Sequence, residues 1–212
     1  VVIREAERGE LIGVISVDVT LEQLTPGEAP VTVIFTSNTL IHEAYRGRRL
    51  IERIGVQVWL RERIRHPDRM IDWFDDTFSY KSYLLLSRSF ATYWPRPGHD
   101  PPTHIHDLMD RLARRRYGDA WDAGRGVVRN LTGKRLKEGV APVTEERLQD
   151  PHIAFFNERN PLASKGEMLV CLCPLTVENW SCLAKRMGSY LMKRKVAAFS
   201  RSRPPLSLRK RL

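Results

Sequence analysis

The sequence predicts an α/β fold, and three observations lead to this prediction. In the first half of the chain, β-rich runs and amphipathic helical segments follow one another in the order β-β-β-α-β-α. With 212 residues, 42% of them hydrophobic, the chain is long and apolar enough to bury a core. No run approaches the roughly 18 uninterrupted apolar residues that span a bilayer. We therefore expect a globular, cytoplasmic protein.

The first three elements are strands. Val1 to Ala6 and Leu11 to Thr20 are β-rich runs, and the Glu7 to Glu10 segment between them is typical of a hairpin turn. Val31 to Ile41 is strongly β-prone and is expected at the centre of the sheet. Because the chain starts with Val1, inside an expected strand, we expect an N-terminal segment to be missing.

Two helices are expected, one on each side of a fourth strand. Leu50 to Ile64 places apolar residues at helical spacing, with charged residues towards solvent. Met70 to Phe74 forms the fourth strand. The second helix is expected to be capped by Thr77 or Ser79 and to run to about Thr92, before a proline-containing stop.

Residues 1–97 are thus interpreted as the core of the domain, and residues 98–150 as a helical insertion. The insertion is richer in charge and in residues that break helices and strands. Its expected helices lie at Ile105 to Arg116 and near Thr144 to Leu148.

Residues 151–195 are expected to complete the domain. The two apolar runs His152 to Phe156 and Met168 to Leu172 predict a long-looped hairpin, the last hairpin of the sheet. Glu178 to Lys195 resembles a closing helix. Residues 196–212 are basic and are expected to form a disordered tail.

The net charge of +10 lies at the C-terminal end. Ten basic residues and no acidic residue lie between Leu183 and Leu212, which leaves 25 basic against 25 acidic residues elsewhere. If the chain binds nucleic acid or an anionic surface, we therefore expect it to do so through residues 185–212. The alternative is a solvated chain end. The sequence does not indicate an oligomeric state.

The segment Tyr45-Arg46-Gly47-Arg48-Arg49 lies between an apolar strand and a long helix. The start of a helix presents unpaired backbone N–H groups and the positive end of the helix dipole, which favours a phosphate. Arginine side chains add charge-assisted hydrogen bonds, and Gly47 permits a tight turn. Without an anion, basic residues here would oppose the dipole. The turn therefore predicts an anion site, with a solvated basic turn as the alternative.

Ile41 to Ile51, after a β-rich strand, resembles the coenzyme A-binding strand, turn and helix of the GNAT superfamily of N-acyltransferases, and the likeness in element order covers residues 1–95. It implies a mixed, mainly antiparallel sheet with flanking helices. It also implies that the strand pairs with the pantetheine arm, that the turn holds the pyrophosphate, and that the next strand splays away to admit the thioester. The residues that it assigns to coenzyme A are Leu40, Ile41, Arg46, Gly47, Arg48, Arg49, Leu50 and Ile51.

Arg49 and Ile51 stand where that family's turn usually has glycine and a small residue. This departure leaves open a looser site for coenzyme A, or a different carrier such as the phosphopantetheine of an acyl carrier protein.

Acyl transfer to an amine needs a base, donors for the oxyanion and an acid for the thiolate. His42 and Glu43, at the end of the strand, are candidate bases that act directly or through water; ordinary polar residues at a strand end are the alternative. In the family, a tyrosine on the helix after the next strand is the acid. Its usual position is Leu85 in this chain, so Tyr83, two residues earlier, is the candidate that could serve from a neighbouring turn, with core packing as the alternative.

Asp75 and Asp76 are expected after the fourth strand, where they could bind a cationic acceptor or cap the helix. Cys171, Cys173 and Cys182 are too few and too clustered for a disulfide framework, so they are expected to be buried thiols. No paired Cys-x-x-Cys motif, which a zinc site would need, is present. We expect no metal.

The expected function is therefore that of an N-acyltransferase. It would move an acyl group from acetyl-CoA or a longer acyl-CoA to a small-molecule or peptide amine. One alternative is a non-catalytic GNAT-like module that binds an acyl carrier or a partner protein. The other is a nucleic-acid-binding protein that acts through its basic tail.

Overall fold

The computed structural model describes residues 1–23, 27 and 29–201, and for residues 190, 191 and 193–201 it describes the backbone alone. The strands are β1 (Val2–Arg4), β2 (Leu11–Glu22), β3 (Val31–Ile41), β4 (Ile71–Thr77), β5 (Trp121–Asp122), β6 (Val127–Val128) and β7 (Met168–Pro174). The α-helices are α1 (Leu50–Arg65), α2 (Tyr80–Ser89), α3 (Thr103–Tyr117), α4 (Pro151–Arg159) and α5 (Val177–Arg201).

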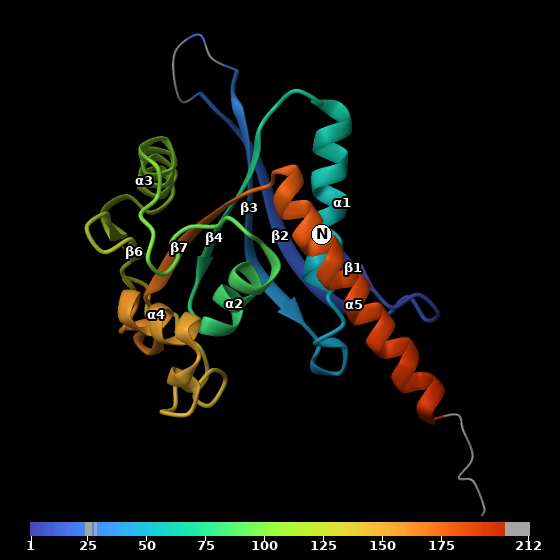
Figure 1. The fold of residues 1–212 in the computed structure, drawn as a ribbon. Helices are drawn as coiled ribbons and strands as arrows, with labels where there is room; N and C mark the ends of the chain where they lie inside the picture. Colours follow the sequence, from blue (N-terminus) through green and yellow to red (C-terminus); the bar gives the residue numbers. More distant parts are fainter. Residues whose placement is uncertain (24–26, 28, 202–212) are drawn as a thin grey trace, which may run out of the picture.

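Within these residues the strands form one sheet in the order β1-β2-β3-β4-β7-β6-β5, with helices on both faces (Figure 1). β3 and β4 are parallel, and the other neighbouring pairs are antiparallel. The predicted α/β class with a mainly antiparallel mixed sheet is therefore confirmed.

Alternation along β3 divides the core between the two faces of the sheet. Ile34 belongs to a buried cluster with residues of α1, α2, α4 and α5, such as Phe156 and Leu183. Val33 belongs to a second cluster, in which α3 contributes residues such as Leu112. Four helices thus cover one face, and α3 covers the other (Figure 1).

The predicted elements of residues 1–97 are present, with small changes at their ends. Ser79 caps α2, since its hydroxyl accepts a hydrogen bond from the Ser82 N–H at 3.4 Å. The helix ends at Ser89 rather than near Thr92. Its continuation is prevented because the N–H groups of Ala91 and Thr92 donate to the side chain of Asn179 instead of to helix carbonyls.

The predicted hairpin of His152 to Phe156 with Met168 to Leu172 is wrong. His152 to Phe156 lie in α4, whose start is set by Asp150: its carboxylate accepts a hydrogen bond from the His152 N–H at 2.9 Å. Pro151 occupies the first turn, where its missing N–H has no consequence. The second run does form a strand, β7, which pairs with β4 and β6.

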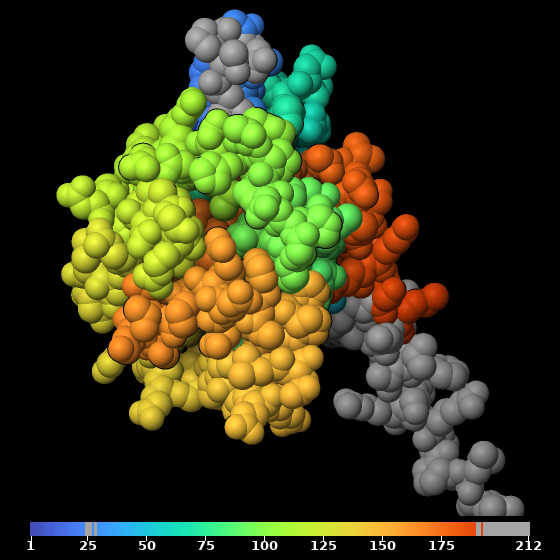
Figure 2. Space-filling view, turned by 60° about the vertical axis from the view of Figure 1, so that its left-hand side comes forward, coloured from blue at the N-terminus to red at the C-terminus, as the bar shows by residue number. Residues whose placement is uncertain are grey.

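Residues 98–150 contain the predicted helix α3 but are not wholly helical. The two short strands β5 and β6 extend the sheet beyond β7. In place of a helix near Thr144 to Leu148 there is a single 3-10 turn, Arg147–Gln149. Figure 2 shows this segment, in yellow-green to gold, as part of one continuous surface with the orange α4 region.

The closing helix α5 continues past Lys195 to Arg201. Residues 196–201 of the expected tail are therefore helical, and residues 202–212 lie outside the described part of the chain. Among the described residues, no helix has both the length and the apolar character needed to cross a bilayer.

Candidate functional site

The two parallel strands β3 and β4 separate before either of them ends. Their pairing runs from Thr32 opposite Ile71 to Thr36 opposite Asp75. Beyond these residues β3 continues to Ile41 beside β2, and β4 continues beside β7. The pairing of β3 with β4 ends just beyond Thr36 and Asp75, and we call this point the β3–β4 fork. Because the strands are parallel, the fork opens towards the C-terminal ends of both.

The backbone of β3 bends just beyond the fork. Asn38 has a φ of 46°, and the pairing of β2 with β3 shifts register between Val14 and Ser16. Such a bulge redirects one strand relative to its neighbour. The bend therefore gives a local cause for the separation of β3 from β4.

The turn between β3 and α1 contains two residues with positive φ. Gly47 has a φ of 75°. Arg49, the residue at which α1 begins, has a φ of 56° and a ψ of 38°, and no side chain caps the helix there. The Arg49 guanidinium lies 3.8 Å from the Glu52 carboxylate. A left-handed backbone costs about 1–2 kcal/mol for any residue other than glycine.

The two other arginines of the turn are exposed and held in place by neighbours. The Arg46 side chain folds back, and its Nε donates to the Ile41 carbonyl oxygen at 3.1 Å. The Arg48 guanidinium lies over the Tyr45 ring, 4.6 Å from its centroid. The start of α1 thus combines uncapped N–H groups with two exposed positive charges, which is an arrangement suited to an anion.

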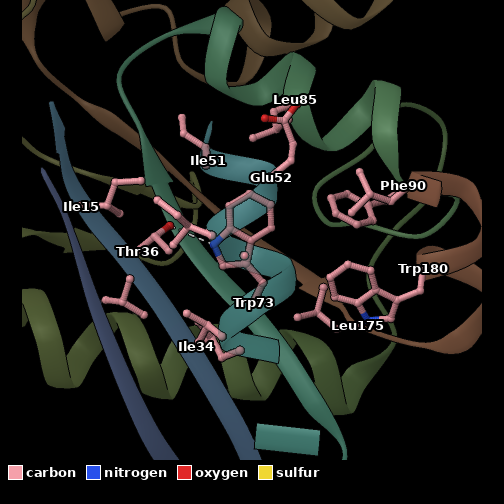
Figure 3. Close-up of a pocket in the computed structure, with 15 residues that line it drawn as sticks. Ile15, Ile34, Thr36, Ile51, Glu52, Trp73, Leu85, Phe90, Leu175 and Trp180 are labelled. Carbon is pink, nitrogen blue, oxygen red and sulfur yellow. Dashed lines mark hydrogen bonds between the residues drawn. The ribbon is translucent and has the colours of Figure 1, made fainter. Parts of the chain in front are cut away.

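An apolar cavity of about 50 Å³ lies beside the fork, between the sheet and helices α1, α2 and α5. Figure 3 shows side chains from all of these elements gathered around the ring of Trp73. Ile34 lies on the sheet, and Ile51 comes from the first turn of α1. Leu85 of α2 and Trp180 of α5 line the same space. The cavity can accept an apolar group close to the proposed anion site.

A chain of hydrogen bonds connects the cavity with the fork. The Trp73 Nε1–H donates to the Thr36 hydroxyl at 2.9 Å, drawn as a dashed line in Figure 3. The same hydroxyl donates to Asp75 Oδ1 at 2.9 Å. Burial and the neighbouring charge of Asp76 raise the pKa of Asp75 well above its usual value, although the hydrogen bond from Thr36 acts in the opposite direction.

Asp75 and Asp76 lie inside β4, which continues to Thr77, and not after the strand as expected. Neither of them caps α2, because Ser79 does so. Asp76 accepts a hydrogen bond from the Tyr117 hydroxyl of α3. Burial raises the pKa of Asp76, and the hydrogen bond from Tyr117 and the charge of Arg116 partly offset this rise.

Asp72, at the start of the same strand, is 2% exposed. Burial raises its pKa to about 7. Its Oδ1 is buried without a hydrogen-bond partner in the described part of the chain.

The candidate catalytic residues lie in different surroundings. His42 and Glu43 are exposed in the turn after β3, where the His42 Nδ1 accepts a hydrogen bond from the Ala44 N–H at 3.3 Å. Tyr83 is completely buried in the core, and its hydroxyl donates to the Pro95 carbonyl oxygen at 3.0 Å. Burial is the main cause that raises the pKa of Tyr83. These contacts favour the packing role of Tyr83, and the structure does not group it with His42 and Glu43.

Cys171 and Cys173 are buried on β7, and Cys182 is half-buried on α5. Residues 1–23, 27 and 29–201 contain no group of three or more His, Cys, Asp or Glu side chains placed to hold a metal ion.

The sequence did not single out Thr36 or Trp73, because both are ordinary strand residues. Only the register that places Thr36 opposite Asp75, and Trp73 beside them, brings the three side chains together.

Comparisons of the chain with protein-family models, with curated proteins and with solved structures found no match.

Proposed function

We propose that this chain is a GNAT-like N-acyltransferase that moves an acyl group from a coenzyme A-type thioester to an amine. The observation that carries the proposal is the β3–β4 fork, which is followed directly by a helix start with uncapped N–H groups and exposed arginines. A long, flexible carrier with phosphates at one end and a thioester at the other needs both features next to each other.

The chain's own residues fit the parts of such a carrier. Arg46 and Arg48 would neutralise a pyrophosphate at the start of α1. Among the described residues, the main chain of β3 beyond Thr36 pairs with β2 on one side and with no strand on the other, so this other side can accept an extended arm as an added strand. The apolar cavity beside Trp73 would take the acyl group.

Arg49 is the position where the GNAT turn usually has glycine, and here it adopts the left-handed backbone that glycine adopts without cost. The backbone therefore supports the likeness at the very residue where the sequence departs from it. An arginine side chain in place of glycine would restrict the approach to the helix start, which also suits a carrier other than coenzyme A, such as the phosphopantetheine of an acyl carrier protein.

Isothermal calorimetry of the full chain with coenzyme A, acetyl-CoA and a longer acyl-CoA tests the proposal. We expect binding of at least one of them, and thiol release when the bound thioester is offered a panel of amines. No heat of binding with any of the three would contradict the proposal for coenzyme A.

A non-catalytic module that binds an acyl carrier is the second candidate, and the burial of Tyr83 favours it. With its hydroxyl bound to the Pro95 carbonyl, Tyr83 offers no proton to a departing thiolate. Calorimetry and the amine assay together separate the two candidates. Binding with no thiol release for any amine identifies the module, and thiol release that depends on the amine identifies the transferase.

Nucleic-acid binding through the tail stays a prediction, because residues 202–212 lie outside the described part of the chain. Deletion of residues 193–212 tests it. If the chain binds nucleic acid in a salt-dependent way and its affinity is the same after the deletion, the tail is not the binding element.

A further inference from the structure

Asp75 lies at the fork itself. It forms the last pair between β3 and β4, opposite Thr36, so a thioester that enters between the strands would reach this residue first. The side chain is half-buried and projects on the same face as Thr36 and Trp73, the face that holds the apolar cavity.

Asp75 has no basic partner in the described part of the chain, which distinguishes it from Glu22 and Glu167. Glu22 pairs with Arg115, and Glu167 pairs with Arg125 at 2.6 Å. A carboxylate withdrawn from water needs a compensating charge or a proton. At Asp75 the described residues supply hydrogen bonds from the Thr36 hydroxyl and the Asp76 N–H but no positive charge, so an ammonium from outside would provide the compensating charge.

Among the described residues, the groups placed next to Asp75 by the pairing of the strands and by its charge interactions carry no positive charge. Thr36 lies across from it on β3, and Cys171 lies across from it on β7, with a thiol whose pKa is raised by burial. Asp76 follows it on its own strand. From α3, Tyr117 is close enough for the charge of Asp75 to contribute to the rise of its pKa.

We propose that Asp75 is the residue that binds the acceptor amine as an ammonium ion and takes its proton. The inference rests on the proposed acyl transfer and names the base for it. In place of His42 and Glu43, which lie in the exposed turn beyond β3, it assigns a carboxylate at the fork.

In the proposed step, Asp75 accepts one proton from the bound ammonium. The nitrogen lone pair then forms the C–N bond to the thioester carbonyl carbon, and the C–S bond breaks with its electron pair on sulfur. A second nitrogen proton passes to the thiolate, directly or through water, and the third remains on the amide. Protonated Asp75 releases its proton to solvent, so the products are an amide, a thiol and one proton.

The first test follows the Asp75 carboxyl directly. The full chain is labelled with [4-¹³C]aspartate, the Asp75 resonance is assigned with Asp75→Asn, and n-butylamine is added in the presence and absence of coenzyme A. We expect butylammonium to shift the resonance and to lower its titration midpoint. Tetramethylammonium, which has the same charge but no N–H to donate, is the control and should have no effect. An identical response to both cations overturns the inference.

The second test uses activity. Asp75→Asn should lower kcat/KM for amine acylation by about 10²- to 10⁴-fold, the usual contribution of a general base. Asp76→Asn removes the negative charge that, together with burial, raises the pKa of Asp75, so the acid limb of the pH profile should move to lower pH. Wild-type kcat/KM in Asp75→Asn, or an unmoved limb in Asp76→Asn, contradicts the assignment.

The two proposals fail in different ways. Absence of coenzyme A binding overturns the transferase, whereas the Asp75 resonance in butylamine alone still decides whether this carboxylate binds an ammonium. Both variants must keep the wild-type melting temperature within a few degrees, which separates a local effect from unfolding.

Discussion

The two helices that follow the parallel strands begin in opposite ways. α2, after β4, starts with the Ser79 cap. The segment after α2 is held by the side chain of Asn179, which accepts a hydrogen bond from the Ala91 N–H. α1, after β3, starts at Arg49 without a side-chain cap and with a left-handed backbone. The difference indicates that the side chains on the β4–α2 side are used for stability, whereas the donors and charges on the β3–α1 side are the ones that the proposed function assigns to a ligand.

The largest expected effect comes from a change on the β4–α2 side, which we call the closed side. Asn179 is fully buried; its Oδ1 accepts from the N–H groups of Ala91 and Thr92, and its Nδ2 donates to the carbonyls of Thr92 and Pro174 at 2.7 Å. Asn179→Ala leaves these buried groups without partners, so we expect a loss of about 4 kcal/mol in the free energy of unfolding.

Urea unfolding at pH 7 measures this loss. The control is Asn157→Ala, at a half-buried asparagine on α4, which should cost less than about 1 kcal/mol. Equal losses in the two variants would contradict the special role of Asn179.

Asp72 is an exception on the closed side, because it is buried without a partner for Oδ1 in the described residues. With a pKa of about 7 in the folded chain and the ordinary 3.8 when unfolded, the folded state keeps a proton between about pH 4 and 7 that the unfolded state has lost. Stability attributable to Asp72 therefore falls as pH rises through this window, by about 4 kcal/mol in total, and is constant above it.

Asp72→Asn should remove this loss. We expect the variant to be more stable than the wild type at pH 8 and to show a smaller decline in melting temperature between pH 4 and 8. Asp107→Asn, at an exposed acid on α3, is the control and should leave the wild-type slope unchanged. The prediction is wrong if Asp72→Asn and the wild type have parallel curves.

On the β3–α1 side, which we call the open side, the arginines should matter for binding rather than for stability. Arg46→Ala and Arg48→Ala should each weaken the affinity for coenzyme A about tenfold, because each removes a charge-assisted contact worth about 1.5 kcal/mol or more. The melting temperature without ligand should change little, since both side chains are exposed. Calorimetry at two salt concentrations measures the affinity. Arg69→Ala, outside the turn, is the matched control.

The first half of the fold was predictable because its signals are local. β3 and α1 have the periodicity and the breaking residues of their type within a single window, so Val31 to Ile41 was predicted with its observed bounds. His152 to Phe156 was not predictable in the same way, because a short apolar run fits a strand or a buried helix. The Asp150 cap and the pairing of β7 with β4, a partner about a hundred residues away, decide between them.

The site was predictable only in part, for a related reason. The proposed anion-binding turn is contiguous in sequence, so the sequence alone was enough to name Arg46 and Arg48 as its candidate residues. The hydrogen bonds that join Trp73, Thr36 and Asp75 depend on the register of two strands that are separated by α1. Polar residues at the end of an apolar run also indicated that β4 had ended, whereas β7 pairs with it as far as Thr77.

The smallest expected effect separates backbone from side chain in the turn. Arg49→Gly relieves a left-handed conformation and should raise the free energy of unfolding by about 1 kcal/mol. Gly47→Ala introduces the same strain at a φ of 75°, where an added Cβ meets nothing within 4 Å, and should lower it by about 1 kcal/mol. Denaturant unfolding measures both.

The coenzyme A affinity of Arg49→Gly tests which groups of the turn would bind the anion. If backbone N–H groups at the start of α1 hold the pyrophosphate, Arg49→Gly should bind coenzyme A more tightly, because the side chain no longer restricts the approach. A weaker affinity in Arg49→Gly would show that the guanidinium itself is the anion ligand. The uncapped helix start would then be a consequence of the turn and not its binding element.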